Sequence, residues 1–179
     1  MRHAEALRYL ILAAQREGNR WLARQLDQAG VTPSQAEVLR ILLDRAGTTL
    51  RGLGELLVCE SGHSPSRLVS GLVDAGLVDR TVPAANRRQV ELSLTEAGQR
   101  TAREVAAIEE TLYASIEASI GDHDVEAALA LLRDMVAGSP AGEAWARRQL
   151  ATPTPPASAS ASASAPTTPD HARDARSAR

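Results

Sequence analysis

The residues best suited to recognition chemistry stand in a short stretch from Ser61 to Gly76. On a helical wheel its outward side holds small or polar residues and one arginine: Ser66, Arg67, Ser70, Gly71 and Asp74. A solvated helix face usually carries longer charged residues, whereas a small polar face suits close approach to another surface. The major groove of DNA admits an α-helix, and arginine can hydrogen-bond base edges there. An ordinary surface helix is the alternative interpretation.

The ends of this stretch are typical of a helix. Ser64 can cap its start, and Pro65 fits the first helical position, where no amide hydrogen bond is lost. Gly76 supplies the left-handed residue that closes such a helix. The other side of the wheel is apolar, with Leu68, Val69, Leu72, Val73 and Ala75. The pattern predicts an amphipathic helix that buries one side and leaves the polar side free for contact.

Two capped helices come before it in the chain. Thr32-Pro33-Ser34-Gln35 can form a capping box at the start of a helix that ends near Gly47. Thr49 caps a short helix whose inward residues are Leu50, Leu53, Leu56 and Leu57. A turn over residues 59–63 then leads to the Ser64 helix. Two short helices joined by a glycine-containing turn predict a helix-turn-helix.

A β-hairpin is predicted after this unit. Residues 77–82 form its first strand, with Val78 and Val82 on one side. Residues 89–94 form the second, in which Val90, Leu92 and Leu94 alternate with polar residues. The loop between them carries Asn86, Arg87 and Arg88 at its tip. A two-stranded hairpin is marginal alone, so we expect it to pack on the helices.

Long helices flank this central part. Residues 3–27 repeat apolar side chains at helical spacing, and Thr95 caps a helix to about Ile120. Asp122 is expected to cap the next helix, whose inward residues are Val125, Ala128, Leu129, Leu132 and Val136. A last short helix is expected from Ser139 to Leu150. A domain of residues 32–98 cannot cover all these apolar stripes, which favours a homodimer.

Composition limits the function classes only loosely. The chain of 179 residues is 44% hydrophobic, lacks Phe, and has a net charge of −2 with arginine as all 20 of its basic residues. Bulk charge therefore does not indicate nucleic-acid binding, and any attraction must come from a local patch. Such a patch is weakly present in residues 61–90, where Arg67, Arg80, Arg87 and Arg88 outnumber Asp74 and Asp79.

The compartment and the chain ends are inferred from simple features. Cys59 is the single cysteine, which excludes an internal disulfide and fits a reducing cytoplasm. We interpret Cys59 as a packing residue and not as a redox sensor. The sequence shows neither a signal peptide nor a membrane span, so we expect no membrane partner. Residues 151–179 are an Ala/Ser/Pro-rich tail, expected to be disordered.

Taken in order, these elements resemble the MarR family of winged helix-turn-helix transcriptional regulators. The likeness covers residues 32–98: Thr32-Pro33-Ser34-Gln35, Pro65-Ser66-Arg67-Leu68-Val69, Gly76-Leu77-Val78-Asp79-Arg80, Arg87-Arg88 and Leu94-Thr95-Glu96-Ala97-Gly98. Each piece is weak alone, but their order and spacing are fairly specific. In place of Asn86 the family usually has an acidic residue that orients the arginine after it. The resemblance implies a homodimer joined through its first and last helices, with recognition helices in the major groove and wings in the minor groove.

The expected fold is mainly α (α+β), a winged helix-turn-helix with a two-stranded wing and long N- and C-terminal dimerisation helices. Residues 1–150 would form this domain, with a DNA-binding core at about 32–98. The expected partners are double-stranded DNA and a second copy of the chain, with a small-molecule effector of unknown identity left open. The candidate DNA-binding residues are His63, Ser64, Ser66, Arg67, Ser70, Gly71, Asn86, Arg87 and Arg88.

The function expected from the sequence is that of a homodimeric repressor of a pseudo-palindromic operator. The alternative is a winged helix used only for dimerisation or protein contact. We expect no enzyme activity and no cofactor, because no nucleophile grouping or phosphate-binding loop is recognisable. No convergent zinc ligands are recognisable either; Asp122-His123-Asp124 is better explained as a helix cap. Trp21 is expected in core or dimer packing more than in ligand stacking.

Overall fold

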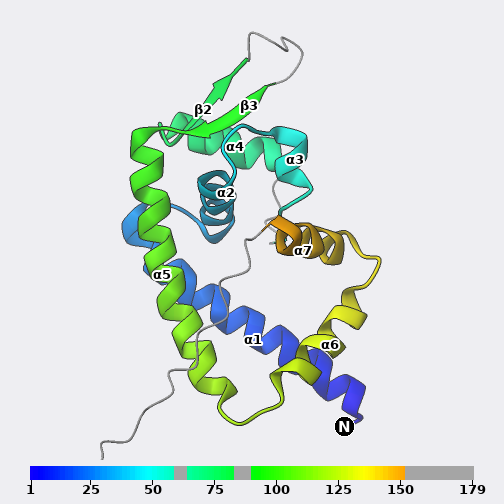
Figure 1. Cartoon of the computed structure of the whole chain (residues 1–179). Helices are drawn as coiled ribbons and strands as arrows, with labels where there is room; N and C mark the ends of the chain where they lie inside the picture. The colour runs from blue at the N-terminus through cyan, green and yellow to red at the C-terminus, as the bar shows by residue number, and fades with distance from the viewer. Residues whose placement is uncertain (59–63, 83–89, 152–179) are drawn as a thin grey trace, which may run out of the picture.

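Helices dominate the computed structural model, which describes residues 1–58, 64–82 and 90–151 (Figure 1). The helices are α1 (His3–Leu26), the short 3-10 helix η1 (Asp27–Ala29), α2 (Pro33–Asp44), α3 (Leu50–Gly54), α4 (Pro65–Asp74), α5 (Glu96–Ile120), α6 (Val125–Val136) and α7 (Pro140–Ala151). The strands are β1 (Thr48–Thr49), β2 (Val78–Thr81) and β3 (Glu91–Leu94). The predicted fold class, a mainly helical winged helix-turn-helix, is confirmed.

The sheet has one strand more than the sequence predicted. Its order is β1-β3-β2, and both pairings are antiparallel. The predicted hairpin is β2 with β3, in the register that sets Val78 opposite Leu94 and Arg80 opposite Leu92. The third strand, β1, precedes α3 and sets Thr48 opposite Leu92. The wing is therefore anchored to the connection between α2 and α3.

Two of the hairpin residues predicted to face the core are exposed. Val82 is 55% exposed and Val90 is 42% exposed, so this part of the prediction was wrong. Pairing in the described ladder reaches only Thr81 opposite Glu91, and both valines lie beyond that pair. They therefore lie past the region where the sheet packs on the helices.

The core is centred on α2, which packs against α1, α4 and α5. Its fully or nearly fully buried members include Leu26, Ala36, Val38, Leu39, Leu42, Leu53, Val69, Leu72, Val78, Leu92, Ala102 and Val105. Aliphatic side chains from the elements around α2 therefore meet in one cluster. Ala75, expected on the buried side of its helix, is exposed because the helix ends at Asp74.

Helix starts are fixed largely as the capping residues predicted. Thr32 forms the full capping box with Gln35, and Thr49 accepts the Gly52 amide at 3.1 Å. The expected cap at Asp122 was wrong: Asp124 Oδ1 accepts the Ala127 amide at 3.0 Å. Helix α6 begins later because the chain first turns after α5, where the His123 amide donates to the Ile120 carbonyl at 2.9 Å.

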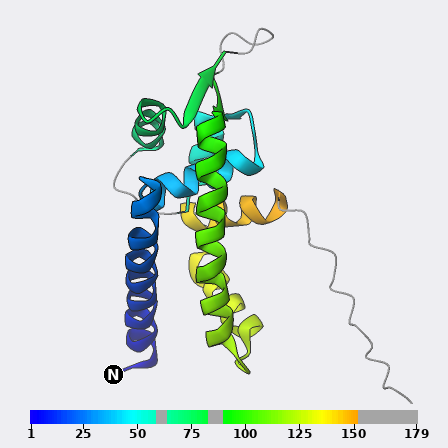
Figure 2. The same ribbon diagram turned by 90° about the vertical axis from the view of Figure 1, so that its left-hand side faces the viewer.

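The long helices extend away from the winged unit (Figure 2). Helix α5 runs down from the wing, α1 crosses its lower half, and α6 and α7 fold back toward α2 and α3. The expected burial of α6 was wrong for a single chain, since none of its residues is buried. Its side chains Leu129, Leu132 and Val136 are 36–41% exposed because the described part of the chain leaves that face open.

Candidate nucleic-acid interface

Helix α4 is held firmly from its buried side. Leu68 is 5% exposed, and Val69 and Leu72 are fully buried. The Ser64 hydroxyl accepts the Arg67 amide at 3.4 Å, and Pro65 occupies the first turn. Gly76 ends the segment in the left-handed region, at φ 70°. The cap, the apolar face and the stop together fix which side of α4 faces outward.

The outward side of α4 presents Ser66 and Arg67 to solvent. Within the residues that the structure describes, Arg67 has no ion pair, so its guanidinium is available to a ligand. A guanidinium can donate two parallel hydrogen bonds to a guanine edge or to a phosphate. Ser66 beside it adds a small group that can donate and accept.

Ser70 joins α4 to the wing. Its hydroxyl accepts a hydrogen bond from Arg80 Nη2 of β2 at 2.9 Å. Arg80 is exposed and therefore extends the polar surface of α4 onto the strand. From the sequence, Arg80 was predicted only as part of the local charge patch and not as a site residue. A two-residue period sets Arg80 on the same face of β2 as Val78, so the sequence pattern did not indicate that the Arg80 side chain is exposed.

Gly71 has a different environment from the exposed residues of α4. It is half-buried, and a Cβ at this position would lie 3.3 Å from Nε2 of Gln35 in α2. Gly71 thus allows α4 and α2 to approach closely, which positions the recognition surface. Its predicted contact with DNA stays a prediction.

Part of the predicted site lies outside the described residues. This holds for His63 at the start of the recognition segment and for Asn86, Arg87 and Arg88 at the wing tip. It also holds for Cys59, whose interpretation as a packing residue stays a prediction. The described surface consists of Ser64, Ser66, Arg67 and Ser70 on α4, with Arg80 beside them.

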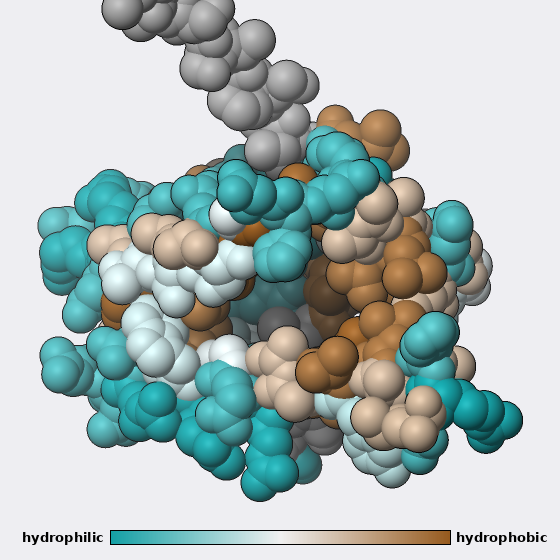
Figure 3. All heavy atoms as spheres, turned by 90° about the horizontal axis from the view of Figure 1, so that it is seen from below, coloured by the Kyte–Doolittle hydropathy of each residue, from teal (hydrophilic) through white to brown (hydrophobic). Residues whose placement is uncertain are grey.

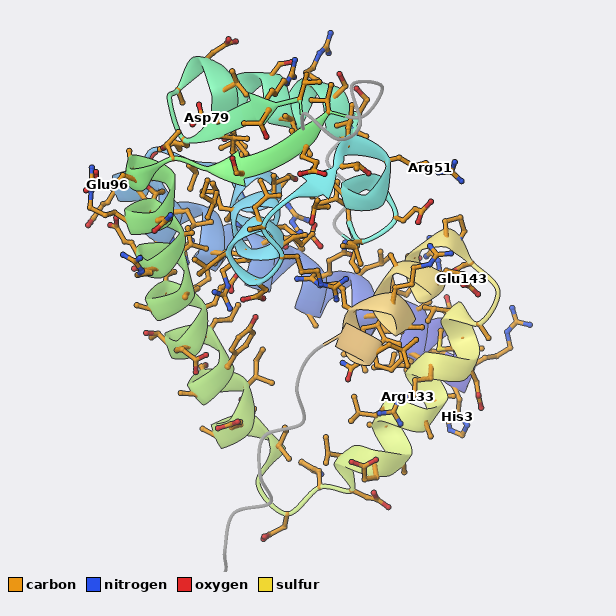
Figure 4. The ribbon with its side chains drawn as sticks, turned by 45° about the horizontal axis from the view of Figure 1, so that its top comes forward. His3, Arg51, Asp79, Glu96, Arg133 and Glu143 are labelled. Carbon is orange, nitrogen blue, oxygen red and sulfur yellow. The ribbon has the colours of Figure 1, made fainter. Side chains whose placement is uncertain are left out.

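The wing and α4 are tied to the start of α5. Thr95 accepts the Gly98 amide at 2.9 Å and donates its hydroxyl proton to the Gly76 carbonyl at 2.8 Å. The Thr95 amide donates to the Leu77 carbonyl at 3.1 Å. One threonine thus caps α5 and also fixes the chain where α4 passes into β2. In Figure 4, Asp79 and Glu96 mark the strand and the helix that meet at this junction.

In the described residues, no three His, Cys, Asp or Glu side chains converge in a way that could hold a metal ion. In those same ranges, none of the helices combines the length and apolar character needed to cross a membrane.

Comparisons with known proteins agree with this geometry. Residues 29–89 match the model of the MarR family. Over that segment the chain is similar to the MarR family. It is 29% identical over 112 residues to the HTH-type transcriptional regulator FarR of Neisseria gonorrhoeae, a match covering 63% of this chain and 73% of FarR. The resemblance inferred from the sequence is therefore confirmed.

Solved structures of MarR-family proteins have the same fold. A MarR-family transcriptional regulator from Silicibacter pomeroyi superposes with a TM-score of 0.59 at 26% identity, covering 74% of this chain and 89% of that one. The S. aureus MepR–DNA complex superposes with a TM-score of 0.66 at 21% identity, covering 76% and 97%. At that identity the MepR likeness shows the fold alone.

Proposed function

We propose that this MarR-family protein is a sequence-specific regulator that binds double-stranded DNA through α4 and the wing. The observation that supports this most is the exposed polar surface of α4, held in place by a buried apolar face and extended by Arg80. We assign DNA contact to the described residues of that surface and, from the sequence, to the loop residues beside them. The set is His63, Ser64, Ser66, Arg67, Ser70, Gly71, Asn86, Arg87 and Arg88.

A homodimer is the second part of the proposal. On the face opposite the wing, hydrophobic side chains gather along one side of a hollow (Figure 3). A cavity of about 590 Å³ lies between α1 and α5 and is lined by residues that include Trp21, Leu112 and Ile116. Other large apolar side chains are exposed on α1, α5 and α6: Tyr9, Leu10, Leu12, Tyr113, Leu131 and Met135. A single chain seldom exposes so much apolar surface unless a partner covers it.

A second copy of the chain is the occupant that fits this surface. A two-fold interface is self-complementary, and the two symmetric α1 and α6 stripes could cover one another. Such a dimer would set two α4 helices about one turn of DNA apart, ~34 Å, and would favour a pseudo-palindromic operator. Repression of transcription and release by a small molecule are finer expectations from the family.

The experiment that tests this function is selection of bound sequences from a random pool of duplex DNA by the full chain. We expect enrichment of a two-fold symmetric site, whose affinity falls with added salt as phosphate contacts require. If no sequence is enriched and all duplexes bind equally weakly, the result would favour the alternative of a winged helix used only for protein contact. A regulator of this kind acts in the cytoplasm and needs no catalytic activity.

A further inference from the structure

The last helix, α7, returns to the helix-turn-helix from the far end of the molecule. Figures 1 and 2 both place it beneath α2 and α3. Arg147 Nη1 of α7 donates to the Glu55 carbonyl at the end of α3, at 3.4 Å. Arg45, which ends α2, donates from Nη2 to the Arg147 carbonyl at 3.4 Å. Ala144 is only 2% exposed, so α7 is packed closely and is not a loose extension.

The strongest link between α7 and the helix-turn-helix is the ion pair of Arg148 with Glu37 of α2. Arg148 Nη1 lies 2.6 Å from Glu37 Oε1, and the Glu37 side chain is only 6% exposed. The same carboxylate oxygen accepts the amide of Val58 at 2.8 Å. A buried carboxylate depends on such partners, because an unpaired charge in this setting is costly. Arg148 therefore supports the carboxylate that holds the chain where it leaves α3.

The connection from α6 to α7 is a tight elbow. The Ser139 hydroxyl donates to the Val136 carbonyl at 2.7 Å and accepts the Gly142 amide at 3.1 Å. A Cβ on Gly142 would collide with the Val136 carbonyl oxygen, so α7 crosses the end of α6 at closest approach. Arg133 and Glu143, labelled in Figure 4, mark the two helices on either side of this elbow. Helices α6 and α7 are therefore in contact at this connection.

We propose that α7 rigidly connects α6 to the helix-turn-helix. Arg148 and Glu37 are then positioning residues, which set the distance between the two recognition helices of a dimer. This inference rests on the proposed function, because it needs a homodimer that reads two half-sites. If α6 lies in the dimer contact, the path from that contact to α4 runs through the elbow, α7, Arg148 and Glu37. Helix α2, which carries Glu37, packs directly against α4.

A second contact joins the helix-turn-helix to the long helices, so the role of α7 can be tested separately from folding. Arg40 of α2 is paired with Glu109 of α5 at 3.0 Å, and the core around α2 is complete without α7. Without Arg148 the protein should therefore still fold, but the orientation of its helix-turn-helix relative to α6 should become variable. The dimer would then tolerate half-sites at several separations, whereas a rigid dimer accepts one.

The test uses duplexes built from the half-sites that the full chain selects from random DNA, with one or two base pairs added or removed between them. For the wild type we expect affinity to fall about tenfold or more away from the best spacing. Arg148→Met should reduce the ratio of affinities between the best spacing and the altered spacings to about twofold, because the helix-turn-helix would adopt several orientations relative to α6. Gly142→Val, which opens the elbow without touching the ion pair, should do the same. Arg148→Lys should restore most of the preference, since it keeps a charged donor.

The matched control is Arg103→Met on α5, which removes the same charge from an exposed side chain that is bonded only to Gln99 at 3.2 Å in the described residues. It should keep the spacing preference of the wild type. A wild type that selects no paired half-sites would refute the proposed function. If the wild type strongly prefers one half-site spacing and both folded variants keep that preference, the proposed role of α7 is wrong and the proposed function stands. If Arg148→Met fails to fold, Gly142→Val decides.

Discussion

Arg40 and Glu109 join the helix-turn-helix to the long helix α5. Arg40 Nε donates to Glu109 Oε2 at 3.0 Å, with side chains 25% and 16% exposed. Burial raises the pKa of Glu109 above its ordinary value of 4.5, and the attraction of Arg40 offsets only part of that effect. Burial likewise raises the pKa of the nearby Tyr113. The pair therefore fixes orientation more than it stabilises the fold.

This pair predicts a pH effect of definite sign. A folded-state pKa above the unfolded value means that the folded chain binds the proton more tightly. The contribution of Glu109 to stability is therefore fully present below the unfolded pKa and is lost as pH rises through the raised pKa. The free energy of unfolding of the wild type, minus that of Glu109→Gln, should decrease between about pH 4 and about pH 7. Urea titrations of both proteins across that range give this difference. A difference that increases with pH would contradict the raised pKa.

Gly98 should be required at the junction of the wing with α5. A Cβ on Gly98 would overlap the Leu77 carbonyl oxygen, which accepts the Thr95 amide. Gly98→Ala should lower the free energy of unfolding by about 1–3 kcal/mol, as overpacking of a closed contact does. Gly18→Ala is the control, because a Cβ there meets nothing within 4 Å. That change in α1 should stabilise the chain by about 0.5–1 kcal/mol. Thermal melts rank the two variants, and equal melting temperatures would disprove the close contact.

Arg67 should carry sequence discrimination. Arg67→Ala should reduce the difference in binding free energy between the selected operator and random DNA by about 1–3 kcal/mol if the Arg67 guanidinium makes a bidentate base contact. Arg51→Ala on α3 is a suitable control, since Arg51 is 90% exposed and points away from the body of the protein in Figure 4. It should change both affinities little. Competition titrations with both duplexes over a salt series measure the difference in binding free energy. An equal loss on both duplexes would mean that Arg67 contacts phosphate instead.

The exposed side of α6 should hold the dimer together. Leu131 is 47% exposed, and Leu131→Glu would put a charge into the proposed contact between chains. We expect sedimentation at micromolar concentration to show a monomer for this variant and a dimer for the wild type, because an unpaired buried charge is strongly unfavourable. Gln99→Glu adds the same charge to an exposed position of α5 and should leave the dimer intact. A stable wild-type monomer would refute the homodimer itself.

Features encoded by neighbouring residues could be predicted from the sequence. Thr32, Thr49, Ser64 and Thr95 cap the helices that they were expected to cap, because each cap involves residues three positions apart. The apolar face of α4 was found through its helical period. Asp124 shows the limit of this approach, since Asp122 two residues earlier has the same side chain and only the turn after α5 decides between them.

Features formed between distant residues could not be predicted in this way. Strand β1 has two residues, which is too short for alternation to show. Arg148 and Glu37 are 111 positions apart, and neither stands in a local pattern that identifies its partner. The helical period of its residues indicates which face of α6 is apolar, but it does not indicate what covers that face.

The two-residue strand β1 also has a consequence for the free protein in solution. Because β1 pairs with Glu91 and Leu92 on the far side of β3, that part of the central strand is not open to another strand. The remaining outer strands are short, and β2 carries the charged Asp79 and Arg80. Short and charged edges resist strand-to-strand aggregation. Thr48 and Thr49 thus protect the wing from self-association during the time when no DNA covers it.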